Sequence, residues 1–232
     1  MKIMIANAEG FLFNPNGFVK KLNPLTRRKN KIIRQYLNLE SIKRAKRNHQ
    51  PDLMIVNQIM FSGVGDIPQI DLINNDLLQR KTQFNHYISY RDRGNFSTCL
   101  FGNFNSKTIN LTESSYCLET QVGDISILSI NLSKRKKTRQ EQLSFIEVMI
   151  ERNIHRKYLV VGQFNIKRER ELSSLISSCS LFNLPLNPTY PKLNPKEKSL
   201  RILYHNDIRV FGSRTIDTDF SNHHSVLLEI GN

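Results

Sequence analysis

Short apolar runs rich in β-branched residues recur along the whole chain, and stretches with helical spacing separate them. The runs are four to eight residues long and lie at 2–6, 53–56, 97–101, 125–132, 158–161, 208–211 and 225–230. Runs of this length and composition are typical of buried strands. Apolar residues with helical spacing lie at 28–46, 69–78, 139–152 and 169–178. Strands that alternate with helices in this way predict an α/β fold.

The region from residue 96 to residue 132 departs from this alternation, because one strand pattern follows another there. A purely parallel, doubly wound sheet is therefore excluded, and a mixed sheet is expected. The chain has 232 residues, no internal repeat and no shift in composition that marks a linker. We expect a single domain that spans residues 1–232.

Several protein classes are excluded by the same sequence. Its apolar runs are far shorter than the roughly 18 residues that a membrane-spanning helix needs. The segment MKIMIANAEG turns polar by residue 7, unlike a secretory signal. Cys99, Cys117 and Cys179 are widely spaced, which argues against a disulfide framework and against structural zinc. We expect an intracellular protein of the cytoplasm or an organellar matrix that is not secreted.

The charge is strongly basic and unevenly distributed. The chain has 34 Lys and Arg against 20 Asp and Glu, a formal net charge of +14. Eleven basic residues and one acidic residue lie between residues 20 and 47, and a second basic run lies at 134–139. Such runs can be solvated faces, or reflect an AT-rich coding sequence, but together they favour a polyanionic partner. The candidate contacts are Lys20, Lys21, Arg27, Arg28, Lys29, Lys31, Arg34, Lys134, Arg135, Lys136 and Lys137.

Short polar segments follow or precede several of the predicted strands. They are NAEG after residue 6, NQ after residue 56, N at 131, GQFN after residue 161 and SNHH before residue 225. Each segment alone is typical of a turn or a strand cap. In this order, together with PTYP and LRIL, they resemble the motifs of the endonuclease/exonuclease/phosphatase superfamily, to which DNase I belongs. The resemblance covers residues 2–230.

The resemblance implies a fold of two packed mixed β-sheets flanked by helices, a four-layer α/β sandwich. It also implies a metal-dependent site, from which this chain departs. Ile59 stands where active relatives have a metal-binding Glu, and Gln163 where they have an Asp that acts on water. Asn131 replaces the family's His, Arg201 the Asp of its Ile-Asp-Tyr strand, and Asn222 the Asp of its Ser-Asp-His motif. The remaining family-like residues are Asn7, Gln58, Asn165, Ser221 and His223.

These departures bear on catalysis. Mg²⁺ and Mn²⁺ normally take at least one carboxylate ligand, whereas this site offers amides and adds the cation of Arg201. A neutral Gln163 cannot accept a proton from water, and the loss of a general base costs about 10²- to 10⁴-fold in rate. We therefore expect no cofactor and no metal. Glu9 is the one nearby carboxylate that could replace a lost ligand, because it shares the face of Asn7 on an extended strand.

Three functions follow. The favoured one is a catalytically inactive member of this superfamily that acts as a basic scaffold for nucleic acid or another polyanion, with possible protein assembly partners. The alternative is a phosphodiesterase or nuclease that uses Mg²⁺ or Mn²⁺ through an altered set of Asn7, Glu9, Asn165 and His223. The third is a peripheral protein whose basic segment binds anionic membrane.

Overall fold

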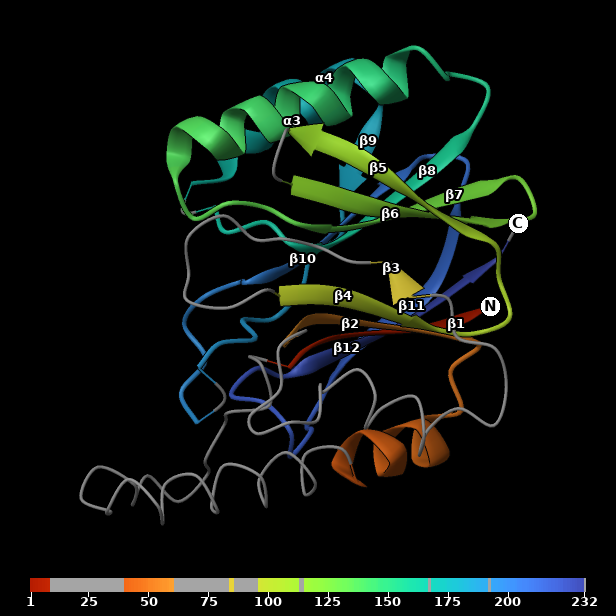
Figure 1. Cartoon of the computed structure of the whole chain (residues 1–232), viewed down its shortest axis with the longest axis vertical. Coiled ribbons are helices and arrows are strands. Elements are labelled where there is room, and N and C mark those ends of the chain that lie inside the picture. The colour runs from red at the N-terminus through yellow and green to blue at the C-terminus, as the bar shows by residue number, and fades with distance from the viewer. Residues whose placement is uncertain are drawn as a thin grey trace.

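The computed structural model describes residues 1–8, 40–60, 84–85, 96–112, 115–166, 168–191 and 193–231, without the side chains of residues 60, 84, 85, 96 and 97. Within these residues two six-stranded sheets pack face to face, and helices lie on the outer side of each sheet (Figure 1). The expected α/β architecture of two packed mixed sheets is confirmed.

The first sheet contains both ends of the chain. Its strand order is β11-β12-β1-β2-β4-β3. β1 pairs in parallel with β2 and antiparallel with β12, so the sheet is mixed. The strands are β1 (Lys2–Asn7), β2 (Leu53–Met60), β3 (Phe84–Asn85), β4 (Phe96–Phe101), β11 (Arg209–Ile216) and β12 (Ser225–Gly231).

The second sheet is formed by the middle of the chain. Its strand order is β5-β6-β7-β8-β10-β9, with β7 and β8 parallel and the other pairs antiparallel. The strands are β5 (Ser106–Thr112), β6 (Ser115–Val122), β7 (Ile125–Asn131), β8 (Lys157–Gln163), β9 (Leu181–Asn183) and β10 (Leu200–His205).

Alternation along the strands divides the apolar residues between the layers. Ile3 and Ile5 of β1 belong to the cluster between the sheets, together with Leu159 and Val161 of β8. The intervening Met4 belongs to a second cluster on the outer side of the first sheet, between that sheet and a helix at residues 40–49 (Figure 1). A sheet covered on both faces explains why these strands are apolar without interruption.

Helices α3 (Lys136–Glu151) and α4 (Ser173–Ser178) cover the outer side of the second sheet (Figure 1). α3 buries Leu143, Ile146 and Ile150, which lie on one helical stripe and pack in the cluster that includes Leu128 and Val160. A 3₁₀ turn, η3 (Glu169–Leu172), directly precedes α4. The sequence pattern predicted one helix over 169–178, and the structure divides it at residue 172.

The structure corrects several other boundaries. The strand expected at 208–211 extends over Arg209–Ile216, because polar residues on this exposed strand hide its length from an apolar pattern. The apolar pattern did not give separate runs for β5, β6, β9 or β10, although the resemblance placed Arg201 on a strand. The helix expected at 28–46 is described only from residue 40 and continues to residue 49, and the one at 69–78 lies outside the described residues. No helix in the described part of the chain is long and apolar enough to cross a membrane.

Candidate functional site

Buried amide side chains lie in register on two pairs of parallel strands, one pair in each sheet. Asn7 at the end of β1 is in register with Asn57 of β2. Asn131 at the end of β7 is in register with Gln163 at the end of β8. All four residues are buried. Because parallel strands end at the same edge of their sheet, each sheet brings two of these amides together.

A chain of hydrogen bonds joins the two sheets at this edge. Asn7 Nδ2 donates to Gln163 Oε1 over 2.9 Å, and Gln163 Nε2 donates to Asn165 Oδ1 over 3.1 Å. Asn165 Nδ2 donates in turn to the carbonyl oxygen of Leu132. Asn165 has a φ of 53°, a left-handed conformation that Asn tolerates better than most residues. Gln163, which stands where the resemblance implies a carboxylate, is therefore hydrogen-bonded between the amides of Asn7 and Asn165.

The second strand places its residues differently from the sequence expectation. β2 has an irregularity between Val56 and Ile59, and Gln58 within it has a φ of 59°. The bulge breaks the alternation, so that Ile59 is buried in the cluster on the outer side of the first sheet. Asn57, which is in register with Asn7, lies within β2 next to this irregularity. Its segment NQ was noted from the sequence, but Gln58 and Ile59 were taken as the site residues. Asn57 Oδ1 accepts a hydrogen bond from Thr98 Oγ1 over 2.9 Å.

His223 is held by a network on the other side of the site. Its Nδ1 lies 2.8 Å from Ser199 Oγ, which lies 3.0 Å from Thr189 Oγ1. The imidazole ring stacks on Tyr190, with 4.4 Å between ring centroids. The backbone N–H of His223 donates to Ser221 Oγ. A histidine held on so many sides has a fixed ring orientation.

Three of these partners were missed by sequence reasoning: Thr189, Tyr190 and Ser199. Thr189 and Tyr190 belong to the segment PTYP, which was noted only as a motif. In the segment that leads into β10, Arg201 was selected from the sequence and Ser199 was not. Ser199 directly precedes β10, whereas Arg201 lies within β10 in register with Gly162 of β8. Asn222, the residue before His223, is half-buried.

A pocket of about 820 Å³ opens where these residues meet. Gln58, Gln163, Asn165 and His223 line it, and Tyr190 and Ser199 line it beside the histidine. Asn7 touches the pocket region through its hydrogen bond to Gln163. The structure thus brings residues that are far apart in the sequence to one place.

Charged side chains form another part of the pocket lining. Among the described residues these are four basic and two acidic ones: Lys134, Lys196, Lys198, Arg201, Glu169 and Glu197. Arg201 Nη1 donates to both carboxylate oxygens of Glu169, over 2.7 and 2.8 Å. Arg201 is 7% exposed and Glu169 57% exposed, so the pair spans the boundary between protein and solvent. A buried Arg without this partner would be strongly destabilising.

The donors at the site do not fit the divalent metal that the fold family implies. The described residues contain no group of three or more His, Cys, Asp or Glu side chains that could hold a metal ion. The amide oxygens of Gln163, Asn165 and Asn57 already accept hydrogen bonds from protein groups. Mg²⁺ prefers carboxylate and water oxygens, and neutral amides alone replace its hydration shell poorly. Glu9 lies outside the described residues.

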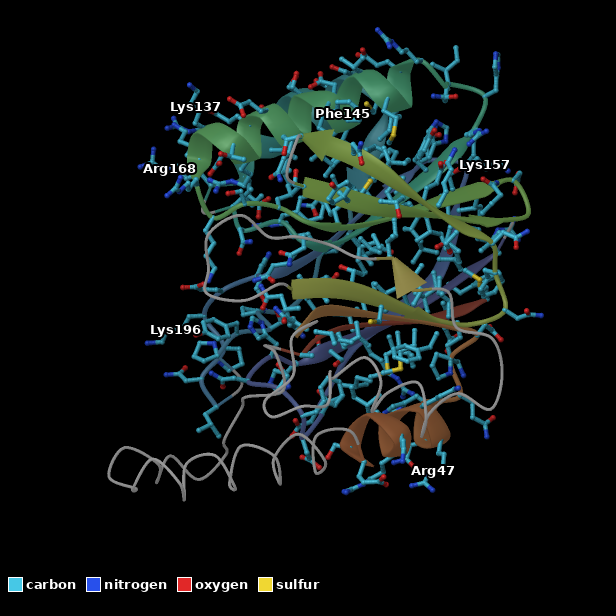
Figure 2. All side chains as sticks on the ribbon, viewed as in Figure 1. Arg47, Lys137, Phe145, Lys157, Arg168 and Lys196 are labelled. Atoms are coloured by element: carbon cyan, nitrogen blue, oxygen red, sulfur yellow. The ribbon has the colours of Figure 1, made fainter. Side chains whose placement is uncertain are left out.

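Some of the predicted polyanion contacts lie outside the described residues, and the others are exposed. Lys20, Lys21, Arg27, Arg28, Lys29, Lys31 and Arg34 lie outside the described residues. Lys134, Arg135, Lys136 and Lys137 are exposed at the start of α3, and Lys134 lines the pocket. Lys137, Arg168 and Lys196 lie on the same side of the molecule (Figure 2). Arg139 differs from its neighbours, because it is buried in an ion pair with Glu171 at 2.7 Å.

Comparison with known proteins assigns the fold. No family model and no curated protein sequence matches the chain. Among solved structures, a mannosyl-6-phosphatase from Bacteroides thetaiotaomicron is similar, with a TM-score of 0.69, 12% identity and full coverage of both chains. An endonuclease/exonuclease/phosphatase family protein from the same organism has a TM-score of 0.68 and 13% identity, over 99% of this chain and 97% of that one.

A third similar structure is that of TDP2 from D. rerio complexed with a single-strand DNA product. Its TM-score is 0.65 at 12% identity, over 100% of this chain and 99% of that one. The chain therefore has the fold of endonuclease/exonuclease/phosphatase family structures, over its whole length.

Proposed function

We propose that this protein binds nucleic acid or a similar polyanion on the pocket side of the fold, and that it does not hydrolyse phosphate esters by the metal-dependent route. The observation that carries the proposal is the hydrogen-bonded chain of Asn7, Gln163 and Asn165 at the strand ends. These groups are neutral and already paired with one another. They supply neither a ligand set for Mg²⁺ nor a proton acceptor for attacking water.

The charge of the pocket lining supports binding of an anion. Glu169 is neutralised by its contact with Arg201, which leaves Lys134, Lys196 and Lys198 against Glu197 among the described lining residues. A cleft with an excess of one charge concentrates ligands of the opposite charge. The exposed basic run at 134–137 extends this charge beyond the pocket. The complex of D. rerio TDP2 with DNA is consistent with a nucleic-acid partner for this fold.

The test is the salt dependence of binding to a fluorescent DNA or RNA duplex. The double variant Lys196→Gln/Lys198→Gln removes two cations from the pocket lining. Each lost phosphate contact lowers the magnitude of the slope of log K against log salt by about 0.9 on a duplex. We expect a decrease of about 1.8, and weaker binding at every salt concentration.

The matched control is Arg209→Gln/Arg214→Gln on β11, which removes the same charge from exposed positions outside the pocket lining. It should leave the slope within about 0.3 of the wild-type value. Equal losses for both double variants would indicate unspecific attraction and would contradict a dedicated surface. Absence of salt-dependent binding by the wild-type protein would reject the proposal outright.

A metal-dependent phosphodiesterase is the second candidate, because the fold neighbours include a phosphatase. It would require Glu9 together with Asn7, Asn165 and His223. Titration of the protein with Mg²⁺ or Mn²⁺ in a calorimeter separates the candidates. We expect no binding heat up to millimolar metal, since amide donors hold these ions weakly. Micromolar affinity that Glu9→Gln abolishes would favour the enzyme.

A further inference from the structure

The ion pair between Arg201 and Glu169 is incompletely matched. Both carboxylate oxygens of Glu169 face one nitrogen, Arg201 Nη1. Arg201 Nε is buried and has no hydrogen-bond acceptor in the part of the chain that the structure describes. A guanidinium presents a planar fork that an oxyanion normally fills with two parallel hydrogen bonds. Glu169 therefore compensates the charge of Arg201 without filling its fork.

The two partners are also unequally anchored. Arg201 lies on β10 in register with Gly162 of β8, inside the second sheet. Glu169 is more than half exposed on the short η3 turn, and it also accepts a 3.3 Å hydrogen bond from Asn183. The Glu169 carboxylate itself would be readily rehydrated by solvent if another anion took its place. The cation cannot follow it, and would remain almost buried without a counterion.

We propose that the Arg201 guanidinium is a binding site for a phosphate group, and that the Glu169 carboxylate is an internal ligand which that phosphate displaces. This inference rests on the proposed polyanion binding and names the group that the pocket recognises. A phosphate offers three or more acceptor oxygens and at least one negative charge, and it forms bidentate contacts with Arg. Lys134, Lys196 and Lys198 line the same pocket and favour the same ligand.

The experiment is a calorimetric titration of the full chain with inorganic phosphate at low ionic strength. Glu169→Gln keeps the size and polarity of the side chain but removes the competing charge. Glu197→Gln removes the same charge from the same pocket, and no ion pair with Arg201 is formed by Glu197 among the described contacts. We expect Glu169→Gln to bind phosphate about tenfold more tightly than Glu197→Gln, and Glu197→Gln to stay within about twofold to threefold of wild type.

An equal gain for the two variants would overturn the inference, because it would show an effect of pocket charge alone. The double variant Glu169→Gln/Arg201→Gln provides a second criterion. It should lose the tenfold gain, with folding checked by circular dichroism. If the double variant folds and keeps the gain, the phosphate is not held by Arg201.

The phosphate group could belong to a free ion or to a nucleic-acid backbone. A six-nucleotide single strand without terminal phosphates is therefore titrated in parallel. A gain for Glu169→Gln over Glu197→Gln with both probes supports a site that accepts backbone diesters, and a gain with inorganic phosphate alone supports a site for the free ion or a monoester. If wild type fails to bind duplex but the gain is present, the proposed function fails while the Arg201 site stands. The reverse result rejects only the site.

Discussion

At the scale of single residues, the site depends on a close approach of two backbones. Gly162 of β8 has a φ of 136°, which is accessible to glycine but strained for other residues. A Cβ atom at this position would lie 2.0 Å from the carbonyl oxygen of Ile130 on β7. Gly162 thus allows β8 to end where Gln163 meets Asn7 across the two sheets.

Gly162→Ala should consequently destabilise the protein by more than about 2 kcal/mol, because the new methyl group collides with backbone and the conformation is strained. Urea denaturation followed by circular dichroism measures the loss. Gly212→Ala is the control, since nothing lies within 4 Å of a Cβ at that exposed position on β11. A loss at Gly162 no larger than the loss at Gly212 would contradict the close approach.

Residue positions at the site were only partly predictable from the sequence. Asn7, Gln163 and His223 could be selected, because each lies in a polar segment that follows or precedes an apolar run. Asn57 lies in such a segment too, but the resemblance assigned the site to Gln58 and Ile59, and the bulge in β2 places Ile59 in the outer cluster. Ser199 could not be selected, since it precedes β10, which the apolar pattern did not predict. Neither the bulge in β2 nor the register of β10 can be predicted from the spacing of apolar residues.

At the scale of elements, strands with a continuous apolar run were recognisable from the sequence, and edge strands with polar residues were recognised partly or not at all. β7 is buried at every position, and its limits match the predicted run to within one residue. β5 is exposed or half-buried at all but one of its positions and lies at the edge of its sheet. β11, another edge strand, was predicted at half its length for the same reason. Edge strands in natural proteins usually lack a continuous apolar run, because an exposed apolar edge promotes aggregation.

β6, next to this edge, carries the buried carboxylate of Glu119. Glu119 is 4% exposed and lies 2.8 Å from Lys107 Nζ and 2.9 Å from Arg156 Nη1. Burial raises the pKa of Glu119, but hydrogen bonds from Lys107 and Ser126 and the two positive charges outweigh burial and lower that pKa below its ordinary value. A carboxyl group with a depressed pKa in the folded state stabilises the protein when ionised.

We therefore expect wild type to be more stable than Glu119→Gln near pH 7, and the difference to shrink as the pH falls below about 4.3, the ordinary pKa of Glu, toward the depressed folded value. Urea denaturation at a series of pH values from 7 to 3 measures both proteins. The control is Glu229→Gln, because that carboxylate is half exposed and 4.0 Å from Lys2. A difference for Glu119→Gln that is independent of pH would contradict a depressed pKa.

At the scale of the whole molecule, the order of the motifs predicted the fold more securely than any one of them did. Four amides or polar residues at strand ends reach the same edge only if two sheets pack with their strand ends together, and the structure has this arrangement. Within the described part of the chain, the exposed basic run at 134–137 was predictable from the sequence. Pairing of Arg201 with Glu169, and of Arg139 with Glu171, depends on packing between elements that are 32 residues apart.

The cluster between the sheets also bears on the expectation of a single domain. Ile5 of β1 in the first sheet and Ile202 of β10 in the second are both 0% exposed and belong to this one cluster. Neither sheet can expose its inner face without loss of the other sheet's packing, so the two sheets should unfold together. Ile5→Ala and Ile202→Ala should each lower the free energy of unfolding by about 2 to 5 kcal/mol.

Both variants should retain one cooperative urea transition that coincides by circular dichroism and by tyrosine fluorescence, shifted to lower urea. Ile154→Ala is the matched control, since that side chain is 70% exposed and its truncation should change the free energy by no more than about 0.5 kcal/mol. Two separated transitions, with Ile5→Ala shifting one and Ile202→Ala the other, would mean that the sheets unfold as independent units. The chain would then contain two folding units. If both sheets share one core, the first sheet cannot unfold while the second sheet keeps its stability.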